Sequence, residues 1–319
     1  MTRRAGLAAC VLLLGVTIVL GLAIGARDLS WDVVLHALRT REGEAGEIVW
    51  AVRIPRTILA LCVGAALGVA GALMQALTRN PLADPGLLGV NAGAAAAVVL
   101  GVVLGLPDGD VPRLILALIG AGLASALVMA LGHSLILAGA AITATLTGLV
   151  AGITLLDQNA FDHYRFWVVG TLADQTLDLL RYAGPVLLAG LVIAVGVGRV
   201  LDVIALGDDS GAALGANPAR TRLWGLTAVA LLCGAATALV GPIGFLGLAV
   251  PHAARLICGA RQRWILAYSA ILGPLVLLAA DVLGRIAARP GEIEVAIVMG
   301  LIGAPVFIAL ARTRKVADL

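Results

Sequence analysis

The sequence predicts an all-α membrane protein with about ten transmembrane helices. Of its 319 residues, 61% are hydrophobic and only 13% are charged, which is too few charges to cover the surface of a soluble chain of this length. Long uncharged runs recur along the chain, and the first, residues 6–25, is long enough to cross a hydrocarbon core about 30 Å thick. We therefore expect one transmembrane domain over residues 1–319.

Ten apolar segments have the composition of spans. They cover residues 6–25, 57–77, 87–106, 114–131, 138–156, 183–198, 223–240, 242–258, 265–283 and 295–311. The first could instead be a removable signal peptide with Arg3 and Arg4 as its basic region. We favour a retained helix, because the run is longer than a usual signal core and no clear small-residue cleavage site precedes Arg27.

The charges indicate an orientation. An even number of spans places both termini on one side, and with that side inside the cell twelve basic residues lie inside and ten outside. This excess is slim but has the sign of the positive-inside rule. We expect a multi-pass protein of the inner (plasma) membrane with both termini in the cytoplasm, surrounded by lipid. The arginines are dispersed, so no nucleic-acid partner is indicated.

Three segments between the spans are long enough to have their own structure. Residues 28–55 form an outer segment, with a helix expected after Ser30 as its N-cap. Residues 157–182 form a second outer segment, and its aromatic residues suit a helix that lies at the lipid headgroups. Residues 199–222 form the longest inner loop, which is polar and rich in glycine and contains two short helical patterns.

The stretch RNPLADPGLLG, residues 79–89, interrupts two apolar runs. Pro81 and Pro85 disfavour helix in the residues before them, and glycines allow a tight turn into the next span. Asp84 can accept hydrogen bonds from free backbone N–H groups of that next helix. The sequence therefore predicts a rigid inner turn that is broken twice.

The chain has no means of using ATP by itself. Its only lysine is Lys315, followed by valine, so no phosphate-binding loop of the GxxxxGK[ST] type exists. No acid or lysine lies in the middle of an expected span, and Asp281 and His252 fall near span ends, which argues against an ion-coupled carrier. The four cysteines stand alone, so no metal or cofactor site is indicated. Active transport would need a separate ATPase, and the 199–222 loop is the natural place for it to act.

Arginines flank two of the expected spans on the outer side. Arg53 and Arg56 enclose a proline in RIPR, and Arg285 and Arg289 follow the ninth span. Guanidinium groups at a rim can hold the carboxylates of a docking protein in a bidentate manner. The alternative is that these side chains extend to lipid headgroups.

Several motifs carry a family likeness. RIPRTILALCVGAALGVAGALMQALTRNPLADPGLLGVNAGA, residues 53–94, resembles the signature region of the FecCD-type (type II) ABC importer permeases, which transport iron-siderophores, haem or cobalamin. Further similar motifs are GPIGFLGLAVPHAARLICG at 241–259 and AADVLGRIAARPGE at 279–292. The inner sequence LGDDSGAALGA at 206–216 resembles the coupling segment of that family.

The resemblance implies two permease subunits around a pathway, two cytoplasmic ABC ATPase subunits that hold ATP and Mg, and an extracytoplasmic substrate-binding protein. It implies docking of the binding protein at Arg53, Arg56 and Arg285, an inner gate near residues 133–139, and coupling to the ATPases at 199–218. The coupling positions are Leu206, Gly207, Asp208, Ala213, Leu214 and Gly215. The pathway and gate positions are Ser134, Thr143, Thr147 and Thr154.

These features favour a permease subunit that imports a ferric siderophore and is not itself an enzyme. The form of the ARPGE and LGDDSGAALGA motifs resembles siderophore members more than cobalamin members. The alternatives are a haem or cobalamin importer permease and, from a different class, an ion-coupled secondary transporter. One departure concerns residues 292–296, where the family often reads E-L-P-x-G and this chain reads EIEVA, which bears on the docking contacts.

Overall fold

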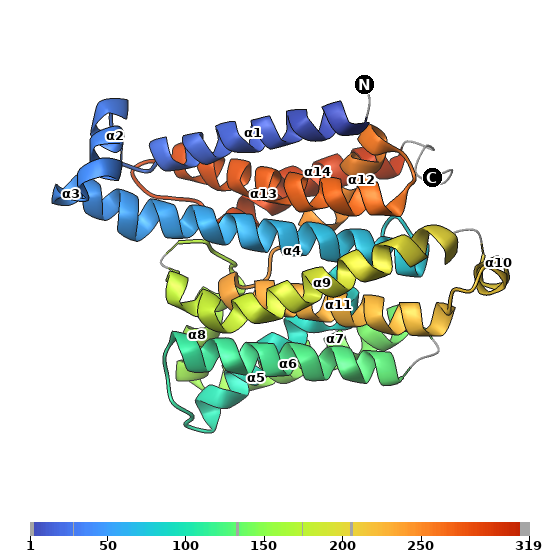
Figure 1. Cartoon of the computed structure of the whole chain (residues 1–319). Helices are drawn as coiled ribbons and strands as arrows, with labels where there is room; N and C mark the ends of the chain where they lie inside the picture. The colour runs from blue at the N-terminus through green and yellow to red at the C-terminus, as the bar shows by residue number, and fades with distance from the viewer. Residues whose placement is uncertain (1–2, 28, 132–133, 174, 205–206, 313–319) are drawn as a thin grey trace.

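The computed structural model describes residues 3–27, 29–131, 134–173, 175–204 and 207–312, and all regular elements within them are helical. Ten apolar helices lie roughly side by side in a bundle (Figure 1). They are α1 (Arg3–Ala23), α4 (Ile54–Thr78), α5 (Val90–Val103), α6 (Asp110–Ala130), α7 (Leu135–Leu156), α9 (Leu180–Ile204), α11 (Pro218–Val240), α12 (Leu246–Cys258), α13 (Gln262–Ala287) and α14 (Val295–Arg312). Each overlaps one expected span, so the predicted fold class is confirmed.

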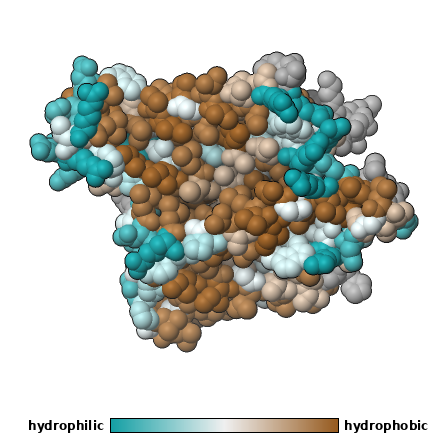
Figure 2. All heavy atoms as spheres, viewed as in Figure 1, coloured by the Kyte–Doolittle hydropathy of each residue, from teal (hydrophilic) through white to brown (hydrophobic). Residues whose placement is uncertain are grey.

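The surface matches a membrane environment. Figure 2 shows hydrophobic residues in a broad band across the bundle and hydrophilic residues gathered at its two ends. Seven of the described helices are long and apolar enough to span a membrane, and α5, α12 and the apolar part of α14 are shorter.

Two of the short helices start inside the bundle. At 1.5 Å per residue, α5 and α12 are only about 20 Å long, less than the hydrocarbon core. A 3₁₀ turn, η2 (Pro85–Leu88), leads into α5, and residues 241–245 without regular structure lead into α12. At the start of α12, the backbone of Gly247 packs directly against Gly71 of α4. A Cβ atom added to Gly71 would lie only 2.0 Å from the Gly247 carbonyl oxygen, so only glycine fits at this position. The expected spans 87–106 and 242–258 therefore contain less helix than predicted.

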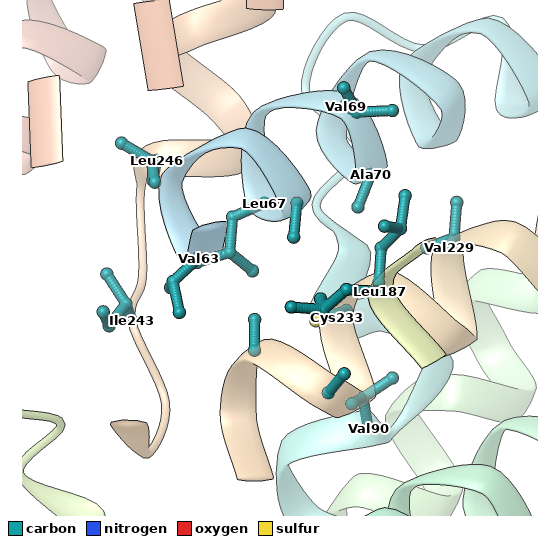
Figure 3. Packing of buried hydrophobic residues seen from close by; sticks show 14 of the residues in the cluster. Val63, Leu67, Val69, Ala70, Val90, Leu187, Val229, Cys233, Ile243 and Leu246 are labelled. Carbon is teal, nitrogen blue, oxygen red and sulfur yellow. The ribbon is translucent and has the colours of Figure 1, made fainter. Parts of the chain in front are cut away.

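Helix α4 lies at the centre of the bundle. It packs against α9, α11, α12 and α13, and most of its residues are buried. Figure 3 shows Val63 and Leu67 of α4 facing Ile243 and Leu246 of the segment that enters α12, with Leu187 of α9 near the same core. Helix α1 packs along α13, and the Tyr268 hydroxyl donates to the Arg3 carbonyl at 2.7 Å.

The two ends of the bundle differ. At one end α1 begins, and α10 (Asp208–Ala213) lies between α9 and α11; we call it the inner end (Figure 1). The other, outer end carries several short helices. These are α2 (Trp31–Thr40), α3 (Gly43–Glu47), the π-helix η1 (Ile48–Arg53), α8 (Gln158–Val168) and the 3₁₀ turn η3 (Leu177–Leu179).

The connecting segments contain more helix than the sequence suggested. Ser30 is the N-cap of α2, although its side chain makes no capping hydrogen bond, and helix also fills residues 43–53. On the inner side, α9 extends to Ile204 and α11 begins at Pro218, so the connection is shorter than the predicted 199–222 loop. Arg199 and Arg222 interrupt apolar runs in the sequence. The helices nevertheless continue through these residues, because a charged side chain does not end a helix.

The turn predicted at residues 79–89 is confirmed. Helix α4 ends at Thr78, and Arg79 follows in the left-handed region with φ of 50°. The Asp84 carboxylate accepts from the Gly86 N–H at 2.7 Å, which caps η2. Gly89 has φ of 70° and leads directly into α5.

Candidate functional site

Three predicted arginines meet at the outer end of the bundle. Arg53 directly precedes α4, Arg56 lies in the first turn of α4, and Arg285 lies in the last turns of α13. Because α4 and α13 pack along each other, the three side chains come together from distant parts of the sequence. They are only 3%, 4% and 2% exposed. We call these arginines, with Asp281 and Glu292, the outer cluster.

Asp281 is the centre of the outer cluster. Its Oδ1 accepts from Arg56 Nε at 2.7 Å, and its Oδ2 lies 2.8 Å from Arg285 Nη2. The carboxylate is completely buried, and helix α13 continues past it to Ala287. Asp281 therefore lies near the end of its helix, as expected, but it is buried among other side chains. A buried carboxylate is stable here because two guanidinium groups compensate its charge.

The arginines also bind the backbone carbonyls at the C-terminal end of α1. Arg53 donates to the carbonyls of Leu22 and Ala23, both at 2.7 Å, and Arg285 donates to those of Gly21 and Ile24 at 3.0 and 2.8 Å. The last carbonyls of a helix have no partners within the helix and carry partial negative charge. The outer cluster therefore joins α1, α4 and α13.

The burial of these arginines bears on the two predicted roles, contact with lipid headgroups and docking of another protein. Extension to lipid headgroups is wrong for Arg53, Arg56 and Arg285, because all three are buried against the protein. Docking of another protein stays a prediction. Within the outer cluster, Glu292 is the partly exposed carboxylate, at 31%, and it binds Arg56 Nη1 at 2.5 Å.

A second charged cluster lies at the inner end. The Asp208 carboxylate, at the start of α10, accepts from Arg79 Nη2 at 2.6 Å and from Arg222 Nη2 at 2.8 Å. Arg79 also donates to the Ile204 carbonyl at 3.1 Å. These side chains are 39–50% exposed. The inner cluster, Arg79, Asp208 and Arg222, thus connects α10 to the end of α4 and the start of α11.

The other predicted coupling positions surround α10. Gly207 and Gly215 border the helix with φ of 115° and 84°, a region that favours glycine. Ala213 is the last residue of α10, and Leu214 after it is 67% exposed. Leu206 lies outside the described residues. A short helix with exposed residues and a glycine near each end is a surface that a partner protein can bind.

The predicted pathway and gate residues lie along α7 rather than in one site. Ser134 caps the helix by accepting from the Leu137 N–H at 3.3 Å, and Thr154 donates back to the Val150 carbonyl. Thr143 is half-buried, and Thr147 is exposed. The gate residue at position 133 lies outside the described residues. Much of α7 is uncovered in the single chain, so these residues form no enclosed site without a partner.

Sequence reasoning missed the partners of the predicted residues. Asp281 precedes Arg285 by four residues, a spacing that places two side chains on the same helical face and could have indicated the pair. The link from Arg79 to Asp208 joins residues far apart in the chain and left no local signal. Within the described residues, no three His, Cys, Asp or Glu side chains gather as metal ligands.

The fold and the site together define a class. Among the described residues, ten apolar helices, two of which begin within the bundle, and a small exposed helix on a connection are typical of a multi-pass membrane permease. The chain matches the FecCD transport family over residues 12–313, and it belongs to that family. It is a permease of the ABC importer type and not itself an enzyme.

Relatives and a solved structure agree with this assignment. The chain is 46% identical over 325 residues to the ferric enterobactin transport system permease protein FepD of Escherichia coli (strain K12), covering 98% of this chain and 97% of FepD. It is 37% identical to the hemin transport system permease protein HmuU of Yersinia pestis, covering 94% and 93%. A structure described as an inward-facing conformation of a putative metal-chelate type ABC transporter superposes with a TM-score of 0.86 at 27% identity, covering 98% of this chain and 100% of that one.

Proposed function

We propose that this chain is the permease subunit through which an ABC importer moves a ferric siderophore across the inner membrane. The observation that carries the cargo assignment is the 46% identity to a ferric enterobactin permease over nearly the whole of both chains. The resemblance of the ARPGE and LGDDSGAALGA motifs to siderophore members points in the same direction.

An importer permease of this type works with ATPase subunits and a substrate-binding protein. We place the ATPases, which hold ATP and Mg, at the inner end around α10, and the binding protein at the outer end. A second permease subunit, identical or related, would cover α7 and complete the pathway along Ser134, Thr143, Thr147 and Thr154. Both termini then lie in the cytoplasm.

The inner cluster supplies a route for force. When an ATPase moves α10, the ion pairs of Asp208 pull on Arg79 at the end of α4 and on Arg222 at the start of α11. Because α4 is the central helix, its displacement changes contacts with four neighbours. Rigid helices that shift in this way open the pathway alternately to the two sides.

The outer cluster supplies a docking position. In the outer cluster, Asp281 pairs with Arg56 and Arg285, and the partly exposed Glu292 pairs with Arg56. A carboxylate of the binding protein could take the place of the partly exposed Glu292 on Arg56, while Arg53 and Arg285 hold the site in position.

Haem is the second candidate cargo, since a hemin permease also matches along almost the entire chain, at lower identity. An ion-coupled carrier is not supported, because the chain belongs to an ABC importer family.

The test is uptake into proteoliposomes that contain the complete transporter. Ferric catecholate, ferric hydroxamate, ferric citrate, hemin and cobalamin are offered in turn with the binding protein. We expect ATP-dependent uptake of a ferric siderophore, unaffected by a protonophore. Uptake of hemin or cobalamin alone would refute the cargo, and uptake driven by an ion gradient without ATP would refute the class.

A further inference from the structure

A groove runs between two helices at the inner end, and no residue of either charged cluster lines it. It lies between α9 and α11, which pack side by side (Figure 1), and has a volume of about 450 Å³. Its deep part is apolar and is formed by Ile193, Val197 and Val200 of α9. Its mouth is formed by Arg220 and Thr221 of α11 and by Gly215, Ala216 and Asn217, which precede that helix.

The groove has an apolar part and a polar mouth, and these match the acyl chain and the headgroup of a phospholipid. Val200 lies four residues from the inner end of α9 and Ile193 about 10 Å deeper, so the apolar wall extends from the interface into the hydrocarbon. Trp224 also lines the groove and is 45% exposed. Tryptophan is enriched at the level of the headgroups. An acyl chain fits the deep part, and a headgroup then lies at the mouth.

The charge at the mouth selects the headgroup. Arg220 is exposed and has no ion-pair partner among the described residues, whereas its neighbour Arg222 is bound to Asp208. Arg199, also exposed, follows Gly196 by about one helical turn and adds a second positive charge beside the groove. Basic pockets between transmembrane helices on the cytoplasmic side bind anionic lipid headgroups.

We propose that the groove between α9 and α11 is a binding site for an anionic phospholipid of the inner leaflet. Its phosphate lies at Arg220 and its acyl chain lies along Val200, Val197 and Ile193. Since α9 and α11 are the two helices that α10 connects, the bound lipid supports the same helices on which the ATPase acts.

The chain offers a matched pair of variants for the groove itself. Gly196 lines the groove and has open space where a Cβ would lie, so Gly196→Leu fills the groove without a clash. Gly184 on the same helix also has open space but does not line the groove, so Gly184→Leu is the control. For the headgroup, Arg220→Gln removes the charge, and Arg263→Gln removes another exposed arginine of the inner end that does not line the groove.

The experiment is native mass spectrometry of the complete transporter, incubated with equal amounts of phosphatidylglycerol and phosphatidylcholine. We expect preferential retention of phosphatidylglycerol, reduced about five-fold by Arg220→Gln because one surface arginine contributes about that factor. Gly196→Leu should reduce retention of both lipids, and both controls should behave as the wild type. An excess of inorganic phosphate should not compete, because the acyl chain contributes to binding.

Three outcomes would overturn the proposal. The first is equal retention of the two lipids by the wild type, and the second is unchanged retention in both Gly196→Leu and Arg220→Gln. The third is competition by inorganic phosphate, which would show a simple anion site. If the groove variants released the ATPase subunits and left lipid retention intact, the groove would be part of the ATPase interface instead.

Discussion

The outer and inner clusters use the same chemistry in different surroundings. In both, two arginines share one carboxylate, and at least one of the two lies on a different helix from it. Asp281 is fully buried and Arg56 and Arg285 nearly so, whereas Asp208, Arg79 and Arg222 are 39–50% exposed. Breaking a buried pair leaves an uncompensated charge without water, while exposed pairs contribute little to stability. We therefore expect the ion pairs of the outer cluster to persist, whereas those of the inner cluster can break and re-form as the helices move.

The largest effect should follow from Asp281→Asn. The change leaves two buried arginines without their shared carboxylate and should lower the free energy of unfolding by about 3–5 kcal/mol. Thermal unfolding of the detergent-purified protein measures it. If Asp208→Asn, the matched change in the inner cluster, destabilised the protein equally, the contrast between the clusters would be wrong.

Arg285→Gln should have the next largest effect. It removes an ion pair with Asp281 and two hydrogen bonds to carbonyls of α1, and should cost about 2–3 kcal/mol. The same thermal measurement serves, with Arg263→Gln as the control, because Arg263 is exposed and lies at the other end of α13. A smaller effect for Arg285 than for Arg263 would contradict the role of the outer cluster in holding α1.

Asp208→Asn should change stability by less than about 1 kcal/mol, because the inner cluster is exposed. Its effect should appear in transport, since α10 loses its ion pairs to α4 and α11. We expect ATP-driven uptake to fall several-fold while the ATPase still hydrolyses ATP. Asp209→Asn on the same short helix is the control, and equal uptake by the two variants would remove the proposed route of force.

Glu292→Gln should have the smallest effect on stability, within about 0.5 kcal/mol, because Glu292 is partly exposed and Asp281 still compensates Arg56. If a carboxylate of the binding protein takes the place of Glu292, this variant should bind that protein several-fold more tightly. Surface-immobilised binding protein measures the affinity. Weaker binding would mean that Glu292 itself contacts the partner.

The sequence alone determined the fold class, the positions of ten apolar helices, the turn at residues 79–89 and the family, because hydrophobic length, proline and glycine act through local geometry. It also indicated Arg53, Arg56, Arg285 and Asp208 as candidate functional residues. The tertiary structure decided what these residues touch. Arg56 meets Asp281 across 225 positions in sequence, and Arg79 meets Asp208 across 129. Only helix packing brings such pairs together, and only packing decides whether water reaches them, so burial of one cluster and exposure of the other could not be predicted from the sequence.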